Sequence, residues 1–250
     1  MINVTRSSLA PDSLNDPKIQ KYLDQLDAYK QDQQLPSAQQ TLVKPECSKS
    51  YRNADLFDLF EADFFSKCYL TEKLFVTPWS MDVEHFWPRN EKPELTYAWS
   101  NLYPADHDAN MHKPNQTPVG GYLDPCNPGE DVEKSIRYAI DIEGGAVHFE
   151  ATDLTNQKAV NTAQLLQRVH NGHSYDTRKK AAEIQTAIQR KYIIVLEHIN
   201  AWWKAVHEQN QVEEFESRRK LMRHLSRRSA YTMLMRSTKA VRALPDSFLD

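Results

Sequence analysis

The sequence predicts an α+β protein that is mainly α-helical, with a small motif of strands and loops embedded in a helical domain. The chain has 250 residues but only 6 glycines, and long stretches lack both Gly and Pro, which is typical of helices. Between residues 68 and 122 the pattern changes, because prolines divide the chain into short segments that suit loops and brief strands. The chain is also long enough to bury its own core.

Two helices are expected in an N-terminal helical region, residues 1–66. Asn15-Asp16-Pro17 combines a capping residue with a proline in the first turn, and apolar residues then recur on one face up to Tyr29. A second helix is predicted over residues 53–65, where several Leu and Phe side chains require burial. The Pro-divided motif follows as a second region, residues 67–125.

The third region, residues 126–250, is predicted to be a hairpin followed by helices. Apolar residues alternate across residues 134–150 around Gly144-Gly145, which favours a hairpin. Helical spacing then predicts a helix that starts at Thr155 or Asn156 and breaks at Gly172, a long helix over about 177–209 and a last, basic helix over about 213–243. Trp202-Trp203 is predicted to lie in the core. We expect the three regions to form one compact unit.

Cysteine usage and hydropathy favour a cytoplasmic protein without a membrane partner. The three cysteines are widely spaced and odd in number, which argues against a disulfide framework. The first residues lack the apolar core of a signal peptide. No apolar run reaches the length that a membrane-spanning helix requires.

The charge distribution leaves two interpretations open. The formal net charge is −3, yet residues 217–244 contain no Asp or Glu and nine Lys or Arg residues. Such a segment is typical of a surface that faces a polyanion, because Lys and Arg near phosphates release condensed counterions. The alternative is a solvated helix face, or a face that docks the acidic N-terminal region or a partner.

The residues with catalytic potential lie between Val83 and Lys113. Hydrolysis of a phosphodiester needs a positioned water, a group that accepts its proton, and a cation that offsets charge on the phosphate. His85 is the candidate base, and Glu84 and Asn110 are the candidate ligands of one Mg²⁺ or Mn²⁺ ion. Asn101 is expected to hold the loop that aims His85, and Lys113 is expected to meet phosphate.

This segment resembles the HNH endonucleases, the ββα-metal nucleases. The resemblance is carried by E-H-F-W-P-R at residues 84–89, by Y-A-W-S-N-L at 97–102 and by Asn110. Further blocks, L-D-P-C at 123–126 and A-V-N-T at 159–162, are similar to the PtuB-type HNH subunit of Septu-type and retron-associated antiphage systems. The matching blocks cover about residues 67–190.

The resemblance implies a metal-dependent endonuclease that acts on nucleic acid, with DNA ahead of RNA, in antiviral defence. It also implies a PtuA-like ATPase partner and a nuclease that is inactive until infection. Arg89 and His112 are then expected to contact the substrate together with Lys113. The alternative is a catalytically inactive subunit with the same fold that binds nucleic acid or the ATPase partner.

One departure from the resembled family concerns its structural zinc, which two C-x-x-C pairs bind. Here Cys68 is present, but Thr71, Asp106 and Ala109 occupy the other three positions. One thiolate does not make a tetrahedral zinc site, so structural zinc is not expected. The alternative is a residual metal site formed by Cys68 and Asp106, with His107.

Overall fold

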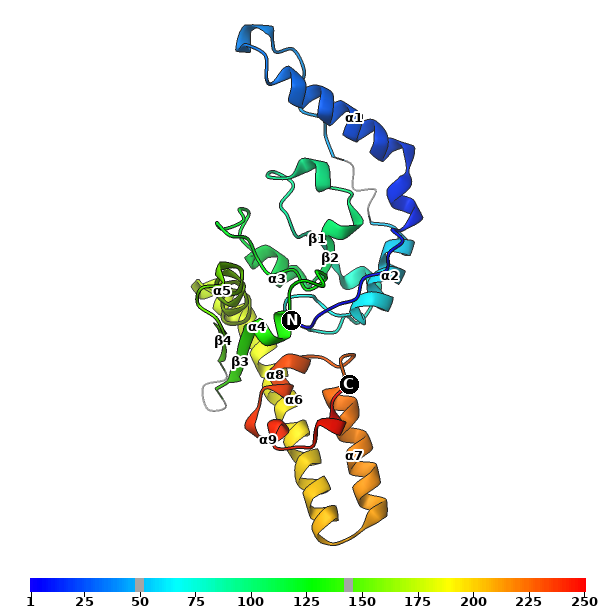
Figure 1. The fold of residues 1–250 in the computed structure, drawn as a ribbon, viewed down its shortest axis with the longest axis vertical. Helices are drawn as coiled ribbons and strands as arrows, with labels where there is room; N and C mark the ends of the chain where they lie inside the picture. Colours follow the sequence, from blue (N-terminus) through cyan, green and yellow to red (C-terminus); the bar gives the residue numbers. More distant parts are fainter. Residues whose placement is uncertain (48–51, 142–145) are drawn as a thin grey trace.

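The computed structural model describes residues 1–47, 52–141 and 146–250 and confirms a mainly helical α+β fold (Figure 1). The strands form two antiparallel pairs in the described residues, β1 with β2 and β3 with β4. The strands are β1 Asp82–His85, β2 Leu102–Ala105, β3 Ile136–Ile140 and β4 Val147–Ala151. The helices are α1 Pro17–Asp32, α2 Ala54–Phe64, α3 His107–His112, α4 Val132–Ser135, α5 Gln157–Asn171, α6 Tyr175–His207, α7 Gln211–Leu225, α8 Thr232–Arg236 and α9 Lys239–Arg242.

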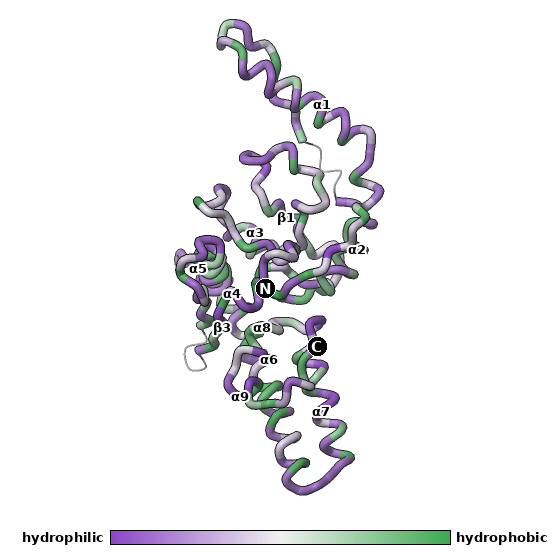
Figure 2. The backbone as a smooth tube through the Cα atoms, viewed as in Figure 1, coloured by the Kyte–Doolittle hydropathy of each residue, from purple (hydrophilic) through white to green (hydrophobic). Residues whose placement is uncertain are grey.

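Both N-terminal helices form where the sequence predicts them. The side chain of Asp16 accepts a hydrogen bond from the backbone N–H of Lys18, and Pro17 is the first residue of α1. Helix α2 ends at Phe64, and the next residue, Phe65, adopts a left-handed conformation with φ 57°. Most of α1 is hydrophilic (Figure 2), whereas α2 buries four large apolar side chains, Leu56, Phe57, Phe60 and Phe64.

The Pro-divided region folds into two short strands followed directly by a helix. Strand β1 pairs with β2 in a register that places Glu84 opposite Tyr103 and His85 opposite Leu102. Residues 86–101, called the β1–β2 connection below, join the two strands through short 3-10 turns. Pro104 fits in β2 because each strand of a two-stranded sheet has an unpaired edge, where a missing N–H is tolerated. Helix α3 then packs against β1.

The predicted hairpin of the third region is confirmed. Strands β3 and β4 pair antiparallel, with Ile136 opposite Ala151 and Ile140 opposite Val147. Burial alternates along both strands, as the sequence pattern indicates, and helix α5 covers β4. The expected turn at Gly144-Gly145 lies outside the described residues.

The predicted break at Gly172 and the long helix after it are also confirmed. Gly172 ends α5 with φ 69° and ψ 167°, a conformation that is essentially restricted to glycine. Ser174 and Thr177 then form a capping box that starts α6, a helix of 33 residues. Of the tryptophan pair, Trp202 lies in the core at 7% exposure, whereas Trp203 is 47% exposed, so the core prediction holds for Trp202 alone.

The prediction of one continuous last helix is wrong. Helix α7 ends at Leu225, and two short helices, α8 and α9, follow after a turn. From α8, the Thr232 hydroxyl reaches back to the carbonyls of Ser226 and Ser229, and Arg236 donates to the carbonyl of Leu225. Such side-chain bonds to the backbone compete with continued helix formation.

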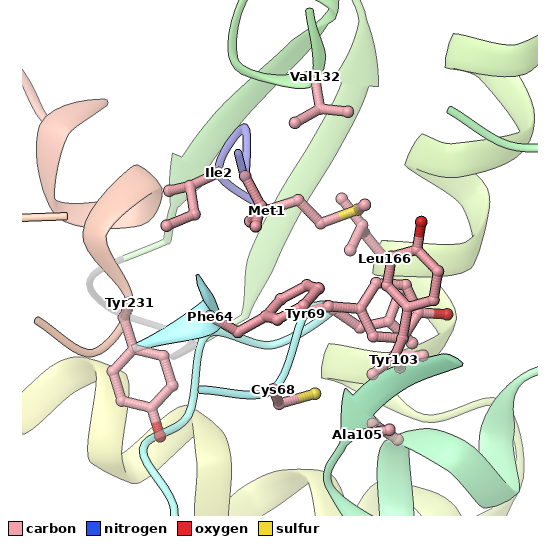
Figure 3. Close-up of a cluster of buried hydrophobic side chains, with 14 of the residues drawn as sticks. Met1, Ile2, Phe64, Cys68, Tyr69, Tyr103, Ala105, Val132, Leu166 and Tyr231 are labelled. Atoms are coloured by element: carbon pink, nitrogen blue, oxygen red, sulfur yellow. The ribbon is translucent and has the colours of Figure 1, made fainter. Parts of the chain in front are cut away.

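The three regions share one cluster of buried apolar residues, which runs from Met1 to Phe248. Figure 3 shows part of it, where Met1 and Ile2 lie among side chains from α2, β2, α5 and the C-terminal part of the chain. Among the residues that the structure describes, no helix is both long and apolar enough to span a bilayer.

Candidate active site

A cavity of about 730 Å³ lies beside β1 and brings together most of the predicted site residues. Strand β1 supplies Glu84 and His85, helix α3 and its C-cap supply Asn110 and Lys113, and the β1–β2 connection supplies Arg89. The N-terminal region supplies a further wall, with Tyr22, Lys44, Pro45, Cys47 and Arg52.

His85 lies at the end of β1 with its ring held by the β1–β2 connection. Its Nε2 lies 2.9 Å from the backbone carbonyl oxygen of Thr96. A carbonyl can only accept, so Nε2 carries the proton and Nδ1 carries the lone pair in the neutral ring. Burial lowers the pKa of His85, which favours the neutral form of the ring. A neutral imidazole in this tautomer can take a proton from water.

Asn101 is buried at 2% exposure and ties the β1–β2 connection together. Its Nδ2 donates to the carbonyls of Trp87 and Leu95, both at 3.1 Å, and its Oδ1 accepts from the N–H of Trp87 at 2.7 Å. Leu95 directly precedes Thr96, the partner of His85. Asn101 therefore occupies a place from which it positions His85 through the backbone, without lining the cavity itself.

Glu84 and Lys113 form a buried ion pair under the cavity. Lys113 Nζ donates to Glu84 Oε1 at 2.5 Å and to the carbonyls of His85 and Phe86 at 3.1 and 2.8 Å. The other oxygen, Glu84 Oε2, accepts from the Tyr69 hydroxyl at 2.8 Å. All three ammonium protons of Lys113 thus have acceptors, so the expected phosphate contact of Lys113 is corrected to a structural clamp between α3 and β1.

Asp82 is a further candidate site residue, which lines the cavity and which the sequence pattern did not single out. It lies two positions before Glu84 on β1, and alternate residues of a strand share one face. Its Oδ2 accepts from Asn110 Nδ2 at 3.2 Å and lies 2.9 Å from His107 Nδ1. The Asp82 side chain is 24% exposed, against 5% for Glu84. This two-residue spacing was the signal in the sequence that could have placed Asp82 on the same face of β1 as Glu84.

A hard cation fits Asp82 and Asn110 better than Glu84. Mg²⁺ prefers oxygen ligands and is commonly held by one or two protein groups, with water and substrate phosphate completing its shell. Asp82 and Asn110 offer a carboxylate and an amide oxygen beside the cavity, whereas both oxygens of Glu84 already have partners. In the described part of the chain, no three His, Cys, Asp or Glu residues form a group suited to a metal.

His112 faces away from this cavity, which corrects its expected contact with substrate. It is 4% exposed and lines a separate cavity of about 210 Å³ together with Lys73, Asp108 and Lys180. Its ring packs edge-on against His173, with centroids 5.8 Å apart. Among the described atoms, Nδ1 of His112 has no hydrogen-bond partner.

The four positions that bind zinc in the resembled family lie together, but with different chemistry. Cys68 Sγ accepts the backbone N–H of Thr71 at 3.4 Å, and burial raises the pKa of the Cys68 thiol. Thr71, Asp106 and Ala109 line the 210 Å³ cavity. The Asp106 carboxylate binds Lys73 at 2.6 Å, and His107 binds Asp82. The alternative metal site of Cys68, Asp106 and His107 is therefore not assembled.

Several arginines of the basic segment 217–244 serve internal contacts. Arg227 binds Glu133 at 2.8 Å, Arg236 binds Asp250, and Arg218 lies over the ring of Phe248. The partners named here lie in residues 133–250, so these contacts do not decide between the two interpretations. Others, such as Lys220 and Arg223, are exposed, and for them the polyanion interpretation stays a prediction.

The fold and the site together define a ββα unit that presents a histidine, an acidic group and an asparagine to one cavity. Comparisons with protein-family models, with curated proteins and with solved structures find no match to this chain. The likeness to HNH nucleases therefore rests on the residues quoted above and on this arrangement.

Proposed function

We propose that this protein is a metal-dependent HNH-type endonuclease that hydrolyses phosphodiester bonds in nucleic acid. One observation carries the proposal: a histidine held in the base-competent tautomer shares a cavity with an accessible pair of oxygen ligands, Asp82 and Asn110. These residues lie on β1 and α3, and the order β1, β2, α3 is the ββα order of the HNH nucleases that the sequence resembles.

In the proposed reaction, His85 Nδ1 takes a proton from a water whose oxygen attacks phosphorus. The bond between phosphorus and the leaving oxygen then breaks. Asn101 and the Thr96 carbonyl keep the imidazole oriented during this step. Asp82 and Asn110 would hold Mg²⁺ or Mn²⁺, which when bound offsets negative charge on the phosphate and the leaving oxygen. Arg89, on the cavity wall, would bind a phosphate oxygen.

The proposal replaces Glu84 by Asp82 as the acidic ligand. To reach a metal, Glu84 would have to leave both Lys113 and Tyr69, which would strand a buried ammonium group. Asp82 would give up its contacts with Asn110 and with His107, whose side chain is 69% exposed, and Asp82 and Asn110 could then share the ion.

The test is cleavage of plasmid DNA and of total tRNA by the purified protein with Mg²⁺, with Mn²⁺ and with EDTA. We expect metal-dependent cleavage that His85→Ala reduces by about 10²- to 10⁴-fold. Asp82→Asn and Asn110→Ala should weaken the binding of Mn²⁺, which electron paramagnetic resonance measures. Asp108→Asn is the matched control, because Asp108 lies on α3 with Asn110 but does not line the cavity that contains His85. Undiminished cleavage by folded His85→Ala would refute the assignment.

The resemblance supports a biological setting for this activity. On that basis we propose a cytoplasmic role in antiphage defence, with an ATPase partner that controls the nuclease. Co-expression with an ATPase encoded beside this gene, followed by affinity purification and cleavage assays, tests the partner. Nucleic-acid binding without metal-dependent cutting, by the protein alone and with that ATPase, would instead support the inactive-subunit alternative.

A further inference from the structure

The N-terminal part of the chain is fixed against the β1–β2 connection. We call α1 and the segment after it, residues 17–47 with Arg52, the N-terminal arm. Tyr22 on α1 packs edge-on against Tyr97 with ring centroids 5.5 Å apart. Lys30 binds Glu94 at 2.8 Å. The arm thus contacts the segment that holds His85, and Figure 1 shows α1 at the end of the molecule opposite α7.

The arm also returns from the end of α1 towards β1. The carboxylate of Asp32 accepts the backbone N–H groups of Thr41 and Leu42 at 3.1 and 3.2 Å, which fixes the reversal after α1. Arg52 Nη2 donates to the carbonyl of Met81 at 3.1 Å, directly beside Asp82. These contacts hold both limbs of the arm and place its residues in the wall of the active-site cavity.

The arm changes the charge of that cavity. Lys44 and Arg52 come from the arm, Arg89 from the β1–β2 connection and Lys113 from the end of α3. The acidic groups of the lining are Asp82 and Glu84, and Lys113 already neutralises Glu84. Cations therefore outnumber carboxylates in this cavity, although the whole chain has a formal net charge of −3. A concave, positively charged wall concentrates anions at the site.

We propose that Lys44 and Arg52 bind phosphates of the nucleic-acid strand that flank the scissile phosphate. Both residues are exposed and line the cavity that contains His85. A guanidinium and an ammonium group are the side chains that bind phosphate oxygens most strongly. The N-terminal arm is then the second wall of the substrate site, opposite α3. This inference rests on the proposed nuclease function.

The test is binding of a fluorescein-labelled 30-nucleotide single strand, followed by fluorescence anisotropy over a range of NaCl concentrations. All proteins carry His85→Ala so that the strand stays intact. Lys44→Gln with Arg52→Gln should bind about 10-fold more weakly at 0.1 M salt. Loss of two phosphate contacts should also reduce the slope of log affinity against log salt by about 1.4. Lys44→Gln alone should lower the slope by about 0.7.

The matched control is Lys18→Gln with Lys21→Gln, which makes the same charge change at exposed positions of α1 outside the cavity. It should retain the affinity of the His85→Ala parent within about twofold. An unchanged salt slope in the folded Lys44/Arg52 variant would overturn the inference, as would an equal loss in the control. Wild-type cleavage decides the nuclease proposal separately, because the binding assay does not depend on catalysis.

Discussion

Replacing Lys113 by methionine should destabilise the protein strongly, because Lys113 neutralises a carboxylate inside the molecule. The side chains of Lys113 and Glu84 are 4% and 5% exposed. Removing the ammonium group leaves Glu84 with the Tyr69 hydroxyl, and it leaves the carbonyls of His85 and Phe86 without this donor. Loss of one partner of a buried ion pair costs about 3–5 kcal/mol of unfolding free energy.

The companion variant Glu84→Gln with Lys113→Met separates charge from packing. The double variant buries no unpaired charge, so we expect it to be roughly 2 kcal/mol more stable than Lys113→Met alone. Urea denaturation followed by far-ultraviolet circular dichroism measures both values. The double variant should regain part of the free energy of unfolding that Lys113→Met loses, although the carbonyls of His85 and Phe86 still lack the Lys113 donor.

The opposite pattern would refute this view of the site. If Lys113→Met kept the urea midpoint of the wild type but weakened nucleic-acid binding, Lys113 would be a substrate ligand and not a clamp. Titration with Mn²⁺ provides the second criterion. Glu84→Gln should keep most of the Mn²⁺ affinity that Asp82→Asn loses, and the reverse order would return Glu84 to the role of metal ligand.

Three further variants test the scaffold. Burial lowers the pKa of His170 to about 4, below its ordinary value of 6.5. Between these two values the unfolded state binds a proton that the folded state does not, so the free energy of unfolding should fall by about 3 kcal/mol from pH 6.5 to pH 4. His170→Leu should remove this dependence, which urea titrations at several pH values measure. Gly172→Ala should cost about 1–3 kcal/mol and lower the Tm in thermal unfolding, because its Cβ would lie 2.5 Å from the backbone nitrogen of Arg178. Asn101→Ala should lower kcat more than it changes KM for cleavage, because His85 loses its support; an effect on KM alone would contradict this role.

The helices and the hairpin were predictable because their signals are local. The helix start at Asp16 and Pro17, the break at Gly172 and the alternation along β3 and β4 each depend on neighbouring residues. The last helix failed for a tertiary reason. Apolar spacing continues beyond Leu225, but Arg236 reaches back to the carbonyl of Leu225 and closes a turn that spacing alone does not reveal.

The candidate site was predictable in its residue types but not in the side-chain partners. The resemblance to HNH nucleases implied a ββα unit around His85, Asn101 and Asn110, and the structure has two strands and a helix in this segment. The partners depend on which way each side chain points from its element. His112 and Asn110 lie on the same short helix, yet they line different cavities.

The sequence by itself determined the mainly helical α+β class and the places of the main helices and the hairpin, and it supplied the histidine and the two asparagines of the candidate site as predictions. The tertiary structure decided which acid is accessible. Glu84 is paired because Tyr69 and Lys113, 15 and 29 residues away along the chain, converge on it in the fold. Asp82 remains at the cavity beside Asn110. Local patterns fix secondary structure, whereas the pairing of buried charges depends on contacts between elements that are distant in sequence.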